Sequence, residues 1–561
     1  MKKTIFFVLA TVALGSCADV CAAADASRVL ATVSCYGDFM GTAPDDQITS
    51  QKVYLYNQDL QVVAVVETAC GQRSKELYTQ YYSPYVYDEA GRLVMIDHYQ
   101  YGLYDYGDRV MHRAAGVVEY RYDEQGNVVE RIENQNSIVY EYDAEGNCTK
   151  EIHYIDGSAG KTLIYSDFSA GKNLPALVES SHSNQTFTGE FYEEEREYSE
   201  SGKLLKAVRL CNRDYVEDYG LWQITTAAGD FMQEEHWTYE GDQLMLYEKF
   251  NSLNEETGEL IPYIKTVYTV KDDHTIGFQS YSAFGRDWYK SGVYQEETYY
   301  DFTGKLDETA LQLVDVRKVG PGMNDAELEW TVPAICASDA SVSYNIYRNG
   351  ELIQNLKQNE ASLSGEGDFI INASGNLVYA DRNIISGEYD YMVQTVIDDE
   401  EGHGYCVSNI LKADLKLEFP AVTNIRAVES VKDNNNYNVV TVLFAVPANA
   451  ADLGFVSNEL ILGNNQVGDD VRYNPEENTM HCTISDDKAV VSILSRYQLG
   501  KVLSERVEID VNNLSSLEQV RALDEKVKIF DLNGNLVSAP IEQLHGTFIL
   551  VGEKKAYKVI L

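Results

Sequence analysis

A short pattern that recurs in the first half of the chain constrains the fold more than any other feature. An aromatic-rich segment ends in Tyr-Asp, and a glycine follows three residues after the aspartate. The clearest copies are Tyr120–Asn127 and Tyr140–Asn147, which start 20 residues apart. Tyr85–Arg92 matches them well, Tyr198–Gly202 and Tyr300–Gly304 match more loosely, and Tyr239–Gly241 is a shortened copy.

The pattern predicts a β-hairpin. Alternation places Val118, Tyr120 and Tyr122 on one face of the incoming strand. Asp123 can accept backbone N–H groups in an Asx-turn, and Gly126 can close the loop in the left-handed conformation. Gly91 and Gly146 occupy the equivalent position. Because a lone hairpin is marginal in water, the hairpins must lie side by side, so residues 25–310 are predicted to form one long, twisted antiparallel sheet or a solenoid.

These copies resemble the YD repeats of Rhs-type bacterial proteins. The resemblance covers about six imperfect units and implies stacked hairpins. Rhs proteins build a large closed shell from many units, and this chain has too few for such a shell, so their toxin-cage function is not expected here. The same stretch is rich in tyrosine, since residues 30–310 hold 31 of the 41 tyrosines.

The remaining length predicts further domains, because 561 residues exceed a single core and roughly 100–200 residues make one domain. Ala326–Pro333 is a strand that ends at proline, Val342–Leu352 contains an Asn-Gly hairpin turn, and Gly387–Val393 alternates. This order resembles a fibronectin type III domain over residues 311–415. The resemblance makes Trp330 the core tryptophan, packed near Tyr344, Ile346 or Tyr391.

Residues 416–514 are similar to a second, degenerate copy of that domain. Phe444-Ala445-Val446-Pro447 mirrors the segment around Trp330, and Gly500–Ser504 echoes the run toward Ser408. Together with the repeat region, the two sandwiches make the expected fold class all-β.

Residues 515–561 form a distinct C-terminal segment with three strand-like runs: Val527–Val537, Leu544–Gly552 and Ala556–Leu561. The segment resembles the C-terminal sorting domain of type IX secretion cargo from Bacteroidetes, in which a strand ends in Asp-Leu-x-Gly. The resemblance implies that the secretion machinery is a partner. Asn535, Phe548 and a non-basic C-terminus depart from the family pattern, and a small third sandwich fragment is the alternative.

The N-terminus has the features of a signal peptide spanning residues 1–24. Lys2 and Lys3 precede the apolar stretch Ile5–Leu14, which is too short to span a bilayer. Ala22–Ala24 and Ala24–Ala26 both fit a cleavage site. Leu14–Cys17 also resembles a lipobox, so lipidation of Cys17 is the alternative to plain cleavage. No later run of 18 apolar residues exists, so no transmembrane segment is expected.

Seven cysteines follow the signal segment: Cys35, Cys70, Cys148, Cys211, Cys336, Cys406 and Cys482. Their sparse, odd number indicates neither a disulfide framework nor a CxxC metal site. Cys336 and Cys406 fall in one predicted domain and could pair, and buried free thiols are the alternative.

The charge of the chain excludes several partners. It has 45 Lys and Arg against 88 Asp and Glu, for a net charge of -43. Such a surface repels nucleic acids and anionic membranes. The sequence has no H-E-x-x-H, G-x-S-x-G, P-loop, dinucleotide or EF-hand pattern. We therefore assign no catalytic residue, metal ligand or cofactor from the sequence.

The remaining polar features are weak indications of a site. Glu193–Glu195 and Asp398–Glu401 are carboxylate runs, which usually form solvated loops. His98 and His236 each stand beside an aromatic residue, which is more typical of packing than of metal binding.

Four tyrosines, Tyr99, Tyr101, Tyr104 and Tyr106, crowd a glycine-bearing stretch. Exposed tyrosines suit the recognition of carbohydrate or protein, and cross-strand aromatic pairing is the alternative. We expect a secreted or cell-surface binding or adhesion protein that contacts a glycan or a host or surface protein through its repeats, with the sandwiches as spacers. An exported hydrolase with a carboxylate site invisible in the sequence is the alternative.

Overall fold

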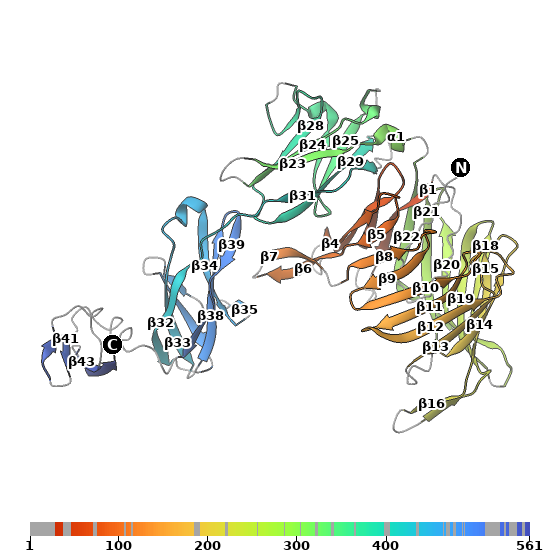
Figure 1. The fold of residues 1–561 in the computed structure, drawn as a ribbon, viewed down its shortest axis with the longest axis horizontal. Coiled ribbons are helices and arrows are strands. Elements are labelled where there is room, and N and C mark those ends of the chain that lie inside the picture. Colours follow the sequence, from red (N-terminus) through yellow and green to blue (C-terminus); the bar gives the residue numbers. More distant parts are fainter. Residues whose placement is uncertain are drawn as a thin grey trace.

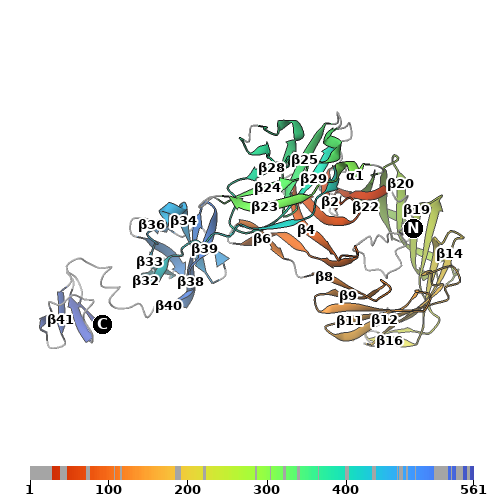
Figure 2. The ribbon, with the colours of Figure 1, turned by 45° about the horizontal axis from the view of Figure 1, so that its top comes forward.

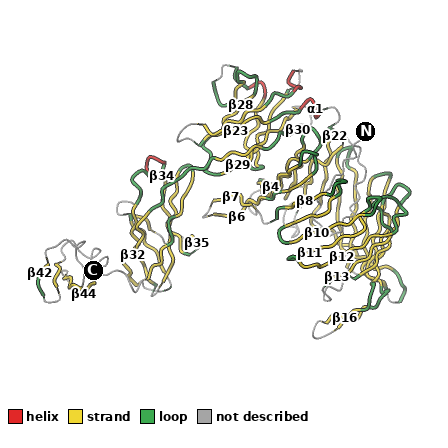
Figure 3. The backbone as a smooth tube through the Cα atoms, viewed as in Figure 1, coloured by secondary structure: helices red, strands yellow, loops and turns green. Residues whose placement is uncertain are grey.

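A computed structural model describes residues 28–560 of the chain with gaps, and its strands far outweigh its short helices (Figure 3). The ranges outside the described residues are 38–46, 71–75, 106–107, 114–115, 184–190, 219–222, 255, 285–286, 303–304, 320–323, 338–340, 364–365, 398–403, 433–436, 464, 467–471, 475–477, 485, 487, 511–527, 532–533, 538–546 and 552–555. The predicted signal peptide and Asp398–Glu401 therefore lie outside the described part. Among the described helices, none is long and apolar enough to cross a membrane.

The first 22 strands run from residue 28 to residue 301. They are β1 (Arg28–Tyr36), β2 (Ile48–Tyr56), β3 (Val62–Cys70), β4 (Leu77–Tyr87), β5 (Leu93–Ile96), β6 (Tyr99–Asp105), β7 (Asp108–Arg113), β8 (Val118–Tyr122), β9 (Val128–Glu133), β10 (Asn136–Tyr142), β11 (Cys148–Ile155), β12 (Ser158–Ser166), β13 (Leu177–His182), β14 (Tyr192–Tyr198), β15 (Leu204–Cys211), β16 (Tyr215–Asp218), β17 (Gln223–Thr226), β18 (Phe231–Glu240), β19 (Gln243–Leu253), β20 (Leu260–Val270), β21 (Thr275–Phe284) and β22 (Asp287–Asp301).

Eighteen of these strands form a closed antiparallel barrel. Each pairs with the next along the chain, except that β5 pairs with β8 and β15 with β18, so the hairpins β6–β7 and β16–β17 stand outside the ring. The ring closes where β1 pairs with β22 along eight residues, from Arg28 opposite Asp301 to Tyr36 opposite Tyr294. Figure 2 shows β9–β12 and β19–β22 as opposite walls of this barrel.

The predicted solenoid or open sheet is therefore wrong, although the antiparallel hairpins are present. Neighbouring strands twist by about 20–25° relative to each other, and open sheets of more than about ten strands curl. Closure pairs the two edge strands, whose backbone N–H and C=O groups would otherwise be exposed. The local repeat defines each hairpin, whereas closure depends on pairing between the two ends of the domain.

The two faces of the barrel are distinguished by what they contact. Leu55 and Tyr82 on one face lie in a cluster with Tyr347 and Met392 of the following sandwich. That face is therefore the outer one, and alternation places Tyr87 and its counterparts on the inner face.

The turn geometry of the repeats is confirmed. In the best copy, the Asp123 N–H donates to the carbonyl of Asn127, and the carboxylate of Asp123 accepts the backbone N–H of Asn127 at 2.8 Å. Gly126 has a φ of 88°, and Gly91 and Gly146 are also left-handed. An unpredicted copy spans Asn57 to Gln61, with asparagine in place of aspartate. Gly304 lies outside the described residues.

In five of the hairpins, the tyrosine that precedes the turn links that hairpin to an earlier one. Its hydroxyl donates to a backbone carbonyl of an earlier hairpin, in three copies that of the first residue after the previous turn. The bonds are Tyr87 to Val62 at 3.0 Å, Tyr122 to Leu93 at 2.6 Å and Tyr142 to Val128 at 2.8 Å; Tyr56 to Leu30 at 2.7 Å and Tyr198 to Pro175 at 3.1 Å are similar. We call these five bonds the tyrosine ladder. It explains why the repeat requires tyrosine rather than phenylalanine before the turn.

Two β-sandwiches follow the barrel, after α1 (Leu306–Thr309). The first contains β23 (Leu313–Val319), β24 (Asp325–Trp330), β25 (Val342–Arg348), β26 (Glu351–Lys357), β27 (Phe369–Ile371), β28 (Leu377–Asp381), β29 (Glu388–Ile397), β30 (Gly404–Val407) and β31 (Leu411–Asp414), with the 3-10 helices Ala334–Ala337 and Gln358–Glu360. The second contains β32 (Thr423–Lys432), β33 (Asn438–Ala445), β34 (Phe455–Leu462), β35 (Asn465–Gln466), β36 (Arg472–Asn474), β37 (Thr479–Ile484), β38 (Lys488–Tyr497), β39 (Gly500–Leu503) and β40 (Val507–Asp510), with the 3-10 helix Ala451–Leu453.

The two sandwiches share one topology. The first has the sheets β23-β24-β28-β27 and β26-β25-β29-β30, and the second has β32-β33-β37-β36 and β35-β34-β38-β39 in the same order. Two facing antiparallel sheets with this order are fibronectin III-like or immunoglobulin-like. Figure 1 shows the first sandwich between the barrel and the second sandwich.

The predicted core residue of the first sandwich is confirmed. Trp330 is fully buried, with its ring centre 5.5 Å from that of Tyr344 and in one cluster with Ile346 and Tyr391. Phe444 is buried in the core of the second sandwich, as the mirrored segments predict.

The predicted correspondence between Ser408 and Ser504 is also confirmed. The Ser408 hydroxyl accepts the Val393 N–H at 3.0 Å, and the Ser504 hydroxyl accepts the Ile493 N–H at 2.8 Å. Cys336 and Cys406 are both free thiols, and Cys336 Sγ lies 3.2 Å from the Tyr344 hydroxyl.

The first sandwich is docked onto the barrel rather than serving as a spacer. Tyr82 of β4 is fully buried against the Asn349–Gly350 turn, where a Cβ added to Gly350 would lie 2.5 Å from the Tyr82 ring. The backbone N–H groups of Asn349 and Asp390 are bound reciprocally, at 2.8 and 2.7 Å. Burial raises the pKa of Asp390. The barrel and the first sandwich therefore form one continuous body, which we call the head.

The last described strands form a small sheet in the order β42-β41-β43-β44. They are β41 (Lys528–Asp531), β42 (Leu536–Val537), β43 (Thr547–Val551) and β44 (Ala556–Ile560). The Asp531 carboxylate accepts the Asn535 N–H at 2.8 Å, and Gly534 has a φ of 85°, as in the turns of the barrel. The three predicted runs thus contribute to one antiparallel sheet.

The tyrosine ladder predicts a specific cost for losing one hydroxyl. Tyr122→Phe keeps the ring but leaves the Leu93 carbonyl without its donor, so the free energy of unfolding should fall by about 1 kcal/mol. Urea denaturation measures this change. The exposed Tyr263→Phe should change it by less than about 0.5 kcal/mol. Equal stability of Tyr122→Phe and the wild type would contradict the ladder.

Docking of the sandwich predicts that substitutions at two left-handed glycines lower the free energy of unfolding by different amounts. In Gly375→Ala the new Cβ meets nothing within 4 Å, so backbone strain alone should lower the free energy of unfolding by about 1–2 kcal/mol. Gly350→Ala adds the collision with Tyr82, which should cost a further 1–3 kcal/mol, roughly. Chemical denaturation and limited proteolysis between the two domains measure the difference, and equal costs would mean that the interface does not form.

Candidate functional site

The four tyrosines predicted as a ligand site fall near the head interface. The Tyr99 ring stacks on Tyr82 with centres 5.9 Å apart, and the Tyr101 hydroxyl donates to the carbonyl of Asn349 at 3.1 Å. Tyr104 belongs to β6, its side chain is outside the described part, and Tyr106 lies outside the described residues altogether. The structure therefore brings Tyr99 and Tyr101 together at the docked sandwich, and a ligand role for the four stays a prediction.

The inner face of the barrel carries charged groups that form ion pairs and hydrogen bonds with side chains of the same face. Within the run Glu193–Glu195, only Glu194 points inward, and its carboxylate binds the guanidinium groups of Arg196 and Arg209. The Glu151 carboxylate accepts the Tyr165 hydroxyl at 2.9 Å. These groups hold neighbouring strands together through buried, paired charge.

Tyrosine and glutamate also meet on this face between the barrel's first and last strands. Burial raises the pKa of Glu297, whose carboxylate accepts the Tyr299 hydroxyl at 2.6 Å. Burial, with the carboxylates of Glu67 and Glu297, raises the pKa of Tyr54 to about 12. Both shifts favour the neutral forms of side chains in the wall.

The two histidines singled out by the sequence have local partners. His98 Nδ1 lies 2.8 Å from the Ser83 hydroxyl, and burial lowers the pKa of His98. His236 Nε2 lies 2.6 Å from Glu234, and its ring lies 5.2 Å from that of Phe250. Within the described residues, no group of three His, Cys, Asp or Glu side chains could hold a metal ion.

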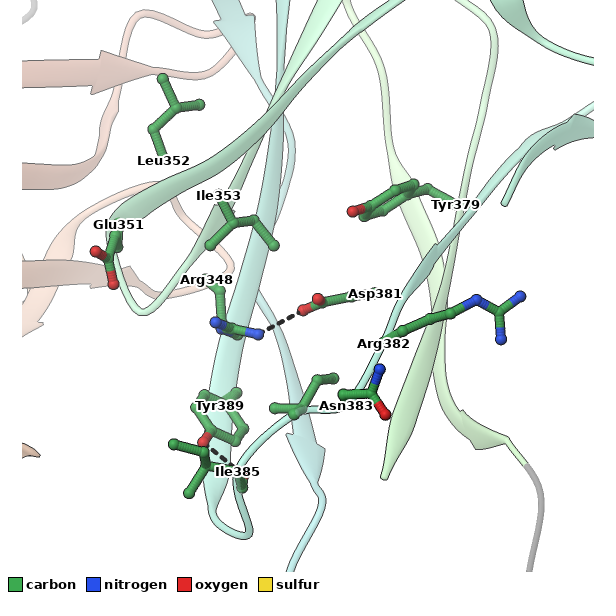
Figure 4. Close-up of a pocket in the computed structure, with 11 residues that line it drawn as sticks. Arg348, Glu351, Leu352, Ile353, Tyr379, Asp381, Arg382, Asn383, Ile385 and Tyr389 are labelled. Carbon is green, nitrogen blue, oxygen red and sulfur yellow. Dashed lines mark hydrogen bonds and ion pairs between the residues drawn. The ribbon is translucent and has the colours of Figure 1, made fainter. Parts of the chain in front are cut away.

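A pocket of about 530 Å³ lies in the first sandwich, between its two sheets. Figure 4 shows Arg348 of β25 facing Asp381 of β28, at 2.8 Å. Asp381 also accepts the Tyr391 hydroxyl at 2.8 Å, and Arg382 binds Asp325 and Asp368. Both arginines of the pocket are thus bound by carboxylates of the same sandwich, and the pair of Arg348 and Asp381 ties its two sheets together.

The outer face of β20, β21 and β22 carries a set of aromatic and basic side chains that the strand register brings together. Their outward residues form a small grid: Tyr263 and Lys265 on β20, Ala283 and Tyr281 on β21, and Trp288 and Lys290 on β22. We call this grid the aromatic strip. The three strands lie side by side in the barrel wall (Figure 1).

Register and contacts agree on this arrangement. Tyr281 lies opposite both Lys265 and Lys290, and Ala283 lies opposite Trp288. The Lys265 ammonium is 4.6 Å from the centre of the Trp288 ring and 5.3 Å from that of Tyr281. All of these groups therefore share one face.

Exposure makes the strip available to a ligand. Tyr263 is 45% exposed and Lys290 is also exposed, whereas Tyr281 and Trp288 are partly covered by the lysine. Phe284 and Tyr289 project from the opposite face of the same hairpin and are 80% and 57% exposed. Large exposed aromatic groups gathered at one place are typical of binding surfaces.

The strip was not predicted from the sequence. The sequence does contain a signal for it, which is the alternation of residues along each strand. The strip residues of one strand are two positions apart: Tyr263 and Lys265, Tyr281 and Ala283, and Trp288 and Lys290. Which of the two faces these residues occupy depends on closure of the barrel, and the repeat pattern leaves that open.

Comparison with known proteins yields no family. No family model and no curated protein matches the sequence. Among solved structures, the chain is similar to a porin-like protein from Bacteroides uniformis, at 13% identity over 48% of this chain and 97% of that one, with a TM-score of 0.22. It is also similar to extracellular domains 3–5 of Drosophila OTK, at 12% identity over 45% of this chain and 97% of that one, with a TM-score of 0.16. A third similar structure is the central fibronectin-III array of RIM-binding protein, at 12% identity over 43% of this chain and 77% of that one, with a TM-score of 0.12. Identities this low carry no information about what this chain binds.

Proposed function

We propose that the chain is an exported binding protein of the bacterial cell surface whose head carries a ligand on the aromatic strip. The N-terminal segment Lys2–Ala24 supports export, and the strands of residues 528–560 support the type IX-like route that the C-terminal resemblance implies. The second sandwich and the C-terminal sheet then connect the head to the secretion machinery or to the surface.

The observation that carries this proposal is the exposed aromatic grid on the outer wall. Trp288 lies opposite the small Ala283, and Tyr263 stands on β20, two strands away from Trp288. Because neighbouring strands are about 4.8 Å apart, the two aromatic side chains arise about 10 Å from each other across the sheet. The barrel closure and the docked sandwich hold this strip on a rigid support, which lowers the entropy cost of binding.

Aromatic truncation tests the proposal. Trp288→Ala should weaken binding about 10- to 100-fold, which corresponds to roughly 1.4–2.8 kcal/mol, because aromatic groups dominate binding surfaces of this kind. The measurement is the binding of the full chain to a glycan and host-protein array, followed by titration of the ligands found.

The same hairpin offers a matched control. Tyr289→Ala removes a more exposed ring from the opposite face and should leave the affinity unchanged. If Trp288→Ala binds every ligand as tightly as the wild type, or if the two variants lose affinity equally, the strip is not the binding surface.

A further inference from the structure

We infer that the aromatic strip selects a glycan residue that bears a carboxylate. This inference rests on the proposed function and adds a ligand class to it. The three rings supply flat apolar surface for a sugar ring, and the two lysines beside them supply the charge that distinguishes an acidic sugar from a neutral one.

The lysines of the strip have no carboxylate partner in the part of the protein that the structure describes. Within the described residues, neither Lys265 nor Lys290 forms an ion pair, although the protein carries a net charge of -43. Glu248 stands opposite Lys265 on β19, yet the ammonium is directed away from it, over Trp288. The two ammonium groups therefore remain available to an incoming anion on either side of Tyr281.

The geometry favours a sugar over a protein partner. A stable protein interface covers about 800 Å² on each side, from some 20–30 residues, whereas the strip consists of six side chains on three strands. Rings with partly exposed faces around a small residue match a ligand of one or a few sugar units. The ammonium groups can accept its carboxylate while its hydroxyls face water.

The overall charge favours isolated carboxylates over a dense polyanion. A nucleic acid or a heavily sulfated chain would meet the repulsion of the whole surface along its length. A single carboxylate at the strip is within a few ångströms of the lysines, while charges beyond about 8 Å are largely screened at physiological ionic strength. The local attraction therefore decides its binding.

Four defined oligosaccharides test the inference on the full chain. 3′-Sialyllactose and trigalacturonate carry carboxylates from two different sugars, and lactose and the methyl ester of trigalacturonate are their neutral counterparts. At about 50 mM salt we expect at least one acidic probe to bind about tenfold or more tightly than its neutral counterpart, with the preference lost at 1 M salt.

Charge variants assign this preference to the lysines. The double substitution Lys265→Gln with Lys290→Gln should abolish the preference for the acidic probe, and Lys265→Arg with Lys290→Arg should retain it. Equal melting temperatures of the two double variants show that folding is not the cause.

The outcomes separate this inference from the proposed function. If acidic and neutral probes bind equally and Trp288→Ala weakens both, the carboxylate inference is overturned and the strip remains a binding surface. If no sugar binds while a protein ligand from the array depends on Trp288, the ligand class is overturned in the same way. If binding is insensitive to Trp288→Ala, both proposals fall.

Discussion

Five hairpin turns of the barrel are each tied to an earlier hairpin by a tyrosine hydroxyl that donates to a backbone carbonyl. In Tyr87, Tyr122 and Tyr142 the acceptor is the residue that leaves the previous turn. The bond lies on the inner face, next to the turn that the aspartate closes. In each Tyr-Asp pair, the aspartate therefore closes its own hairpin, and the tyrosine sets the distance to a neighbouring hairpin. Repetition of this unit gives the wall its regular antiparallel order.

The closed barrel gives this order a functional consequence. Near the closure, the Tyr36 hydroxyl of β1 donates to the Glu296 carboxylate of β22, 260 residues away in the sequence. The wall that closure completes includes β20–β22, which carry the aromatic strip on their outer face. On the same face, β2–β4 hold the first sandwich through Leu55 and Tyr82. The contact surface for the sandwich and the aromatic strip thus occupy separate regions of one rigid outer face.

Local features of the fold could be predicted from the sequence, and long-range ones could not. The Asp123–Gly126 turn, the buried Trp330 and the serine pair Ser408 and Ser504 follow from short patterns whose physics is contained in a few residues. Closure requires β1 to meet β22, and no local signal encodes that encounter.

The candidate site was hidden for the same reason. Tyr99 looks like an exposed aromatic residue in the sequence, but the sandwich that docks beside it is encoded some 250 residues later. The strip residues Tyr263 and Trp288 alternate like any strand. Only the closed wall determines that they face outward.

Closure itself is the central claim, and a disulfide trap tests it most directly. Thr32 of β1 lies opposite Thr298 of β22, and directly opposed residues have Cβ atoms about 4.5–5.5 Å apart, close to disulfide distance. The double substitution Thr32→Cys with Thr298→Cys should form a cross-link on mild oxidation, found by peptide mass spectrometry, with an unchanged circular dichroism spectrum. If the native protein forms no such link, as expected of an open sheet or solenoid with these strands at opposite ends, the account of the barrel is contradicted.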